Sequence, residues 1–110
     1  KWNRRVQDIL ESIAKILRYT HGVDFERFCG EEMMLDAVIR NFAIIGEAAR
    51  HIPAHIEQRY SEIPWARMRG MRNFVVRQYS GIDERIIWDT IQDDLPPLVP
   101  VLERILKENP

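Results

Sequence analysis

The apolar residues at the start of the chain recur at alternating steps of three and four positions. This set consists of Trp2, Val6, Ile9, Ile13 and Ile16. The spacing places all of them on one face of an α-helix. We therefore expect a long amphipathic helix over about residues 2–19, which the His21-Gly22 pair ends.

A second stripe with the same spacing follows, and it consists of Leu35, Val38, Phe42, Ile45 and Ala49. It predicts another long helix over about residues 31–51, which ends before Pro53 because proline disrupts a helix interior. Between the two helices, Asp24 is placed to cap a short helical turn at residues 25–28.

The second half of the chain is divided by prolines and by Ser80-Gly81. We expect a short helix at 54–60, then a helix that begins at Pro64 and continues to residue 79, since proline is tolerated in a first turn. Asp83 can cap a further helix that ends near residue 94, and a last helix begins at Pro97.

No stretch alternates apolar and polar residues over the length of a strand. We therefore predict an all-α antiparallel helical bundle of about five to six helices, in a single domain over residues 1–110. Apolar residues on more than one side of the bundle also suit a dimer. The candidates for that second surface are Met33, Met34, Phe74 and Trp88, and each fits a core position equally well when taken singly.

Composition excludes several classes of protein. Hydrophobic residues make up 45% and charged residues 30% of the chain, and no apolar run approaches the ~18 residues that span a bilayer. The single cysteine, Cys29, cannot form an internal disulfide, and a signal-peptide pattern is absent from the sequence, so we expect a cytoplasmic protein without a membrane role. His51 and His55 lie four positions apart, but Pro53 between them spoils a helical metal face, and we expect no metal site.

Positive charge is concentrated in one segment. Between Glu62 and Asp83 there is no acidic residue, and the arginines there are Arg67, Arg69, Arg72 and Arg77. The chain carries a formal charge of −1, so the remainder carries −5. Such a segment is typical of a phosphate-binding surface, and it is equally typical of a solvated helix face that pairs with acidic residues.

The spacing within this segment limits what one straight helix can do. Arg72 and Arg77 are separated by about 140° of rotation, whereas Arg72 and Tyr79 share a stripe. All three can meet at one ligand only if the helix is distorted near Gly70 or if a second copy of the chain contributes.

Glu47 stands out on the second long helix because its neighbours are small and apolar. A carboxylate in such surroundings is rarely buried without a partner. Arg72 would be a suitable partner, and the alternative is that Glu47 faces solvent.

Several sequence blocks occur in an order found in a known family. They are AVIRN at 37–41, IIGEA at 44–48, IPW at 63–65, GMRN at 70–73, YSGID at 79–83, Trp88, and DLP at 94–96. With them the chain resembles, over almost its whole length, the HEPN-domain toxins of MNT-HEPN toxin–antitoxin modules, the HepT-like ribonucleases.

The resemblance implies an all-α homodimer in which two copies of an Arg-x4-His-x-Tyr motif meet and form a metal-independent ribonuclease site. Cleavage of cellular RNA then needs no cofactor. The implied partner is an MNT-type nucleotidyltransferase antitoxin, which uses ATP and Mg to adenylylate the motif tyrosine.

Carried onto this chain, the motif arginine is Arg72, the residue after it is Asn73, and the motif tyrosine is Tyr79, the expected site of AMPylation. Arg77 occupies the histidine position. The resemblance thus implies a site of Arg72, Asn73 and Arg77, while Glu47 is expected to support it and Arg67 and Arg69 to bind RNA.

Arginine at position 77 departs from the family motif. An imidazole can accept the proton of a ribose 2′-hydroxyl near neutral pH, whereas a guanidinium stays protonated and can only bind phosphate. We therefore expect impaired catalysis, either because the chain is an inactivated variant or because it uses other chemistry. The alternative function is a non-catalytic helical module that binds a nucleotidyltransferase and nucleotide or RNA phosphate.

Overall fold

The computed structural model describes residues 1–74 and 83–110, and all regular secondary structure in these ranges is helical. The elements are α1 (Trp2–Thr20), α2 (Phe25–Gly30), α3 (Glu32–Ala49), α4 (Ala54–Arg59), α5 (Trp65–Gly70), α7 (Glu84–Asp89), the π-helical segment η1 (Thr90–Asp94) and α8 (Leu98–Glu108). The predicted all-α fold is confirmed.

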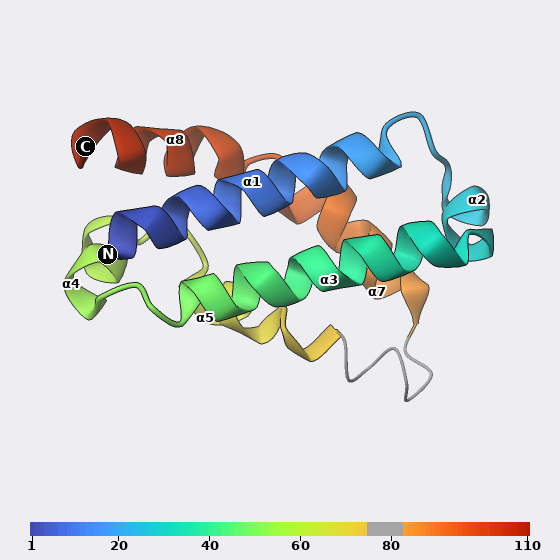
Figure 1. The fold of residues 1–110 in the computed structure, drawn as a ribbon, viewed down its shortest axis with the longest axis horizontal. Coiled ribbons are helices and arrows are strands. Elements are labelled where there is room, and N and C mark those ends of the chain that lie inside the picture. The colour runs from blue at the N-terminus through green and yellow to red at the C-terminus, as the bar shows by residue number, and fades with distance from the viewer. Residues whose placement is uncertain (75–82) are drawn as a thin grey trace.

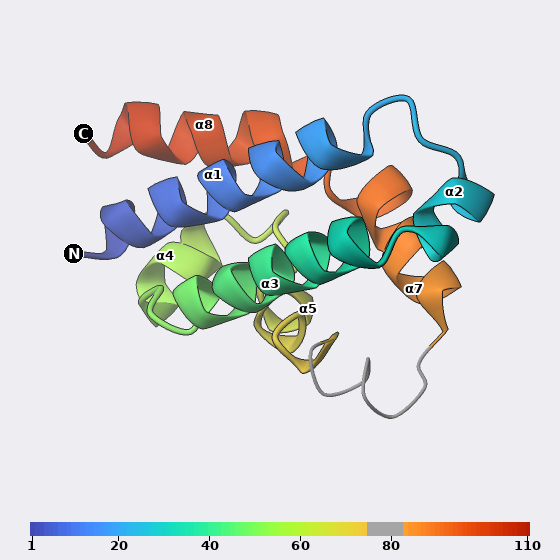
Figure 2. The same ribbon diagram turned by 45° about the vertical axis from the view of Figure 1, so that its right-hand side comes forward.

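The long helices α1, α3 and α8 lie side by side along the longest axis of the molecule, with α1 between the other two (Figures 1 and 2). Helix α1 runs antiparallel to both of its neighbours. Helices α2 and α7 pack together at one end of α3, and α5 crosses the face of α3 that is turned away from α8.

The two predicted apolar stripes form the centre of the core. The residues with no exposed surface on α1 and α3 are Val6, Ile9, Ile13, Ile16, Val38, Phe42, Ile45 and Ala49. Trp2 and Leu35 are only partly buried because they lie near the first turn of their helices. The periodicity of the sequence therefore predicted which side of each long helix faces inward.

The predicted N-terminal caps are confirmed at two helices. The carboxylate of Asp24 accepts a hydrogen bond from the backbone nitrogen of Arg27 at 2.8 Å, and Asp83 accepts one from the backbone nitrogen of Arg85 at 2.9 Å. Each cap satisfies a backbone donor that the first turn of the helix leaves without an internal partner.

The helix expected from Pro64 to residue 79 is interrupted. Helix α5 ends at Gly70, Met71 and Arg72 form a turn, and helical backbone resumes at residues 73–74. The remaining positions of that expected helix, 75–79, lie outside the described residues. The structure thus has a local distortion near Gly70, which is one of the two ways in which the motif residues were expected to meet at one ligand.

Burial explains this interruption. The buried residues of the segment are Trp65, Met68, Met71 and Phe74, each three positions from the next. On a straight α-helix, steps of three rotate the side chain by about 60° backward each time, so the fourth residue would face away from the first. The turn after Gly70 returns Phe74 to the core, where its ring meets Phe42 edge-on at 5.0 Å between centroids.

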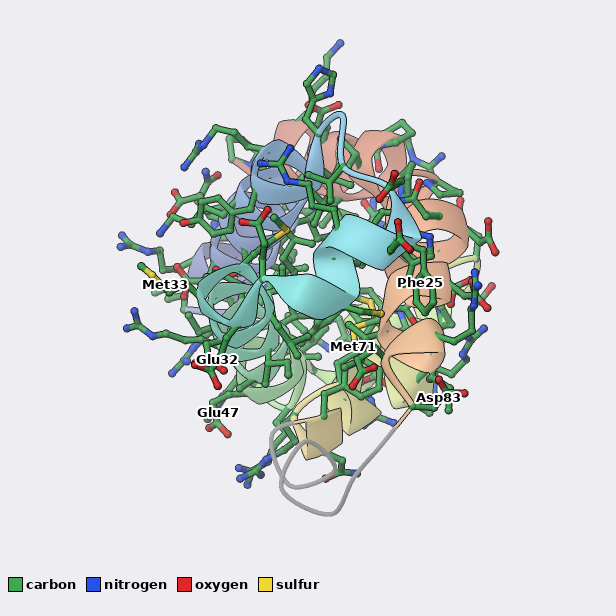
Figure 3. The ribbon with its side chains drawn as sticks, turned by 90° about the vertical axis from the view of Figure 1, so that its right-hand side faces the viewer. Phe25, Glu32, Met33, Glu47, Met71 and Asp83 are labelled. Atoms are coloured by element: carbon green, nitrogen blue, oxygen red, sulfur yellow. The ribbon has the colours of Figure 1, made fainter. Side chains whose placement is uncertain are left out.

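Two of the four candidates for a dimer surface belong to the core of the chain itself. Phe74 is 7% exposed, and Trp88 packs against Phe28 with 5.1 Å between ring centroids. Met34 is partly buried. Met33, in contrast, is 87% exposed and points away from the bundle on the outer side of α3 (Figure 3).

The C-terminal end of the chain bonds to Tyr60, which follows α4, and the N-terminal end bonds to the C-terminal end. The Tyr60 hydroxyl donates to Glu108 Oε1 at 2.6 Å and accepts from Asn109 Nδ2 at 3.1 Å, and the Asn109 carbonyl accepts from Asn3 Nδ2 at 3.3 Å. The phenol is enclosed, since Tyr60 is only 2% exposed. The two termini therefore lie at the same end of the bundle (Figure 2).

Candidate functional site

Helix α3 and the turn after α5 meet backbone to backbone at Gly46. A Cβ atom on residue 46 would lie 2.6 Å from the backbone nitrogen and 2.9 Å from the Cβ atom of Arg72, and 3.0 Å from the carbonyl oxygen of Arg69. No side chain fits in that space, so only glycine permits this approach. The close contact fixes Arg72 against the outer surface of α3.

Glu47, the next residue on α3, is the centre of a charged cluster. Its Oε1 lies 3.0 Å from Arg50 Nη1 and 3.8 Å from Arg72 Nη1, and its Oε2 lies 3.2 Å from His51 Nε2. Glu47 projects outward from α3 (Figure 3), and its side chain is 46% exposed. Both interpretations of Glu47 hold in part, since it faces solvent and also contacts Arg72. We call Glu47, Arg50, His51 and Arg72 the Glu47 cluster.

The cluster keeps its carboxylate ionised. Hydrogen bonds from His51 and from Arg50, together with the nearby charge of Arg72, hold the pKa of Glu47 below its ordinary value of 4.5. An ionised carboxylate has only acceptors, so the Nε2 atom of His51 is the donor in their hydrogen bond. In the neutral imidazole, Nδ1 is then the atom with a free lone pair.

The end of α3 explains the position of His51. The helix ends at Ala49, and the backbone nitrogen of His51 donates to the Ala48 carbonyl at 3.0 Å, so the turn continues the helical path for one more residue. His51 therefore lies one helical turn beyond Glu47 and on the same side of it.

Arg67 and Arg69 form ion pairs within the chain. Arg67 Nη2 lies 2.8 Å from Asp94 Oδ2, and Arg69 Nη1 lies 2.6 Å from Glu57 Oε2. These contacts are what a solvated helix face paired with acidic residues requires. Arg67 is still 70% exposed, so its guanidinium keeps donors that face solvent.

Asn73 lies on another side of the segment from the Glu47 cluster. It lines a groove of about 320 Å³ together with Arg67, Ile86 and Thr90, between α5 and the start of α7. The structure therefore brings Arg72 to Glu47 but does not bring Asn73 there. Arg77 and Tyr79 lie outside the described residues.

Comparison with known proteins identifies the family. Residues 9–105 match the family described as Ribonuclease HepT-like. The chain belongs to the HepT-like ribonuclease family.

Three relatives of this HepT-like chain illustrate the match. The "Probable ribonuclease HepT" of Thermococcus cleftensis is 37% identical over 102 residues, which cover 93% of each chain. The "Putative RNase MJ1380" of Methanocaldococcus jannaschii is 36% identical over 83% of this chain and 84% of its own. The "Putative RNase TTE0752" of Caldanaerobacter subterraneus is 31% identical over 94% of this chain and 92% of its own. No solved structure matches the chain at comparable significance.

A second groove of this HepT-like chain borders the Glu47 cluster. It has a volume of about 350 Å³, lies between α1 and α3, and is lined by Arg5, Asp8, Arg40, Ala43, Ile44, Glu47 and Ala48. Arg4 Nε lies 3.4 Å from Asp8 Oδ1, which partly neutralises that carboxylate. The groove is thus lined by two arginines outside the segment in which the sequence concentrates arginine, Arg5 and Arg40, and by two carboxylates, Asp8 and Glu47.

Neither a metal centre nor a membrane span is found in the described part of this HepT-like chain. Over residues 1–74 and 83–110, no three His, Cys, Asp or Glu side chains are grouped so that they could hold a metal ion. No described helix is both long and apolar enough to cross a bilayer.

Sequence reasoning missed Arg50 and His51 as members of the site. The signal was present, because Glu47 precedes them by three and four positions on a predicted helix, where such pairs face each other. The contact of Glu47 with Arg72 spans 25 positions and depends on the fold.

Proposed function

We propose that this chain is the ribonuclease toxin of a toxin–antitoxin module and that it cuts cellular RNA without a metal ion. One observation carries the proposal: Arg50 and Arg72 approach the same exposed carboxylate and thereby present two guanidinium groups on one surface. Guanidinium groups bind phosphate oxygens in pairs of hydrogen bonds and stabilise the charge that develops on phosphorus during cleavage. Membership of the HepT-like family and the ribonuclease names of its relatives support RNA as the ligand.

The arginines of this site can bind phosphate but cannot perform the proton transfers of cleavage. Cleavage at a 2′-hydroxyl needs a base for that hydroxyl, an acid for the leaving 5′-oxygen, and positive charge near the phosphate. At the motif position, Arg77 supplies only the last of these. We therefore expect this chain to cleave RNA more slowly than a chain with histidine at position 77.

The proposal includes two partners. We expect a homodimer in which the segments around Arg72 lie near the two-fold axis, and a cytoplasmic nucleotidyltransferase antitoxin of the MNT type. With ATP and Mg, the antitoxin would adenylylate Tyr79. An added AMP would place negative charge near the arginines and compete with RNA.

Arg77 also favours a second candidate function. A chain that keeps the cationic surface but lacks the motif histidine suits a non-catalytic module, which would bind a nucleotidyltransferase together with nucleotide or RNA phosphate. The two candidate functions differ in whether RNA bound to the chain is cut.

A cleavage assay with excess protein distinguishes them. Labelled RNA is incubated in EDTA with the chain as it stands, with Arg77→His, and with Arg18→His as a control at an exposed arginine of α1. We expect salt-sensitive RNA binding by all three proteins, slow cleavage by the unaltered chain and by the control, and faster cleavage by Arg77→His. Absence of cleavage by all three proteins would favour the non-catalytic module.

A further inference from the structure

The Glu47 cluster contains a group able to perform the proton transfer that position 77 lacks. We propose that His51, oriented by Glu47, is the general base for RNA cleavage in this chain. The inference rests on the proposed ribonuclease function and names the residue that makes the function possible without a motif histidine.

The geometry prepares His51 for this role. Its Nε2 atom donates to Glu47 Oε2 at 3.2 Å, which fixes the ring and leaves Nδ1 free to accept a proton. The His51 side chain is 45% exposed, so a ribose hydroxyl can reach it. A carboxylate that holds one imidazole nitrogen while the other takes a proton is the arrangement used by catalytic His–Asp pairs.

The charges around His51 come from two segments of the chain. Glu47 and Arg50 belong to the end of α3, and Arg72 belongs to the turn after α5. Arg50 and Arg72 contact the other carboxylate oxygen, which leaves them placed to bind the scissile phosphate beside the imidazole.

The reaction balances without any added cofactor. His51 Nδ1 takes the proton of the 2′-hydroxyl, the 2′-oxygen forms a bond to the adjacent phosphorus, and the bond from phosphorus to the 5′-oxygen breaks. Water protonates the leaving 5′-oxygen, and the imidazolium then returns its proton to solvent. The products are a 2′,3′-cyclic phosphate and a 5′-hydroxyl, with no change in oxidation state.

The other two histidines lack this arrangement. His21 follows α1 and His55 lies on α4, and both are exposed. Within the part of the chain that the structure describes, neither has a hydrogen bond or ion pair from its imidazole. They therefore provide matched controls for removing one exposed histidine.

The test compares His51→Gln with His21→Gln and His55→Gln in the otherwise unaltered chain. Single-turnover cleavage of a labelled RNA is measured in EDTA between about pH 5 and 8, the range in which imidazole groups titrate. We expect His51→Gln to lose about 100-fold or more of the cleavage rate while RNA affinity stays within about twofold, and the two controls to retain the rate.

Two further measurements separate proton transfer from a structural effect. A limb of the pH–rate profile should disappear in His51→Gln. Glu47→Gln, which removes the carboxylate that orients the ring, should slow cleavage while RNA binding is retained. Free imidazole should restore part of the cleavage by His51→Ala, because the truncation leaves space for it. A His51→Ala variant that imidazole does not rescue, with an unchanged pH–rate profile in His51→Gln, would contradict the proposal.

The outcomes also separate this inference from the function on which it rests. If His51→Gln cuts as fast as the unaltered chain, His51 is not the base, although the chain is a ribonuclease. If only Arg77→His cuts RNA, the inference fails and the family chemistry stands. If no variant cuts, the inference and the ribonuclease function both fail.

Discussion

Gly46 holds the backbone of Arg72 against α3, with no room for a Cβ atom between the two. We expect Gly46→Ala to lower the free energy of unfolding by about 1–3 kcal/mol, because the added methyl group pushes the Arg72 segment away from the helix. Urea or guanidinium unfolding measures this change. Gly30→Ala is the matched control, since a Cβ atom at residue 30 has open space around it. The free energy of unfolding of the Gly30→Ala protein should be unchanged or slightly raised.

Arg72 has a second expected role, in cleavage itself. In the Arg77→His background, Arg72→Ala should reduce the cleavage rate by about 10²- to 10³-fold, as commonly observed when one group that stabilises the transition state is removed. The same substitution at Arg67, which is paired with Asp94, should have a smaller effect. Equal losses for the two variants would contradict a specific role for Arg72.

Self-association can be measured directly. If two copies of the motif segment meet at a two-fold axis, sedimentation at micromolar concentration should give the mass of a dimer. Met33→Lys tests the exposed methionine on the outer side of α3: a shift toward monomer would place α3 in the interface, and an unchanged dimer would place the interface elsewhere. A monomer for the unaltered chain would contradict the homodimer.

Adenylylation makes a prediction about one tyrosine. Incubation with ATP, Mg and the cognate nucleotidyltransferase should add AMP to Tyr79, which mass spectrometry of proteolytic fragments can locate. Tyr79→Phe should remain unmodified, and modified protein should bind RNA more weakly because the added phosphate repels it. Modification found only at Tyr19 would contradict the assignment.

The ion pair between Glu62 and Arg104 should make stability sensitive to acid. The hydrogen bond from Arg104 lowers the pKa of Glu62 below its ordinary value of 4.5. A carboxyl group with a lowered folded-state pKa stabilises the fold above the unfolded value, and this contribution is lost as the pH falls through the folded value. The stability difference between the unaltered chain and Glu62→Gln should therefore be present at pH 7 and disappear well below pH 4.5. Glu103→Gln changes an exposed residue next to Arg104 on α8. The stability difference between the unaltered chain and Glu103→Gln should not change with pH in this way.

The two long helices could be predicted from sequence because their stripes are local and regular. The interruption after Gly70 could be predicted only as one of two ways for the motif residues to meet, because the spacing of three from Trp65 to Phe74 becomes informative only when burial is known. Contacts between adjacent helical turns, such as that of Glu47 with His51, were open to sequence reasoning and were overlooked. The approach of Arg72 to Gly46 could not be predicted from the sequence, because it joins segments that only the tertiary packing brings together.

The enclosed phenol of Tyr60 offers a built-in reference for chemical labelling. Its hydroxyl is engaged by Glu108 and Asn109, so a tyrosine-directed reagent should reach it only when the two ends of the chain separate. Labelling of Tyr60 would then report the unfolded fraction of a sample, which allows any surface modification to be corrected for damaged protein within the same spectrum.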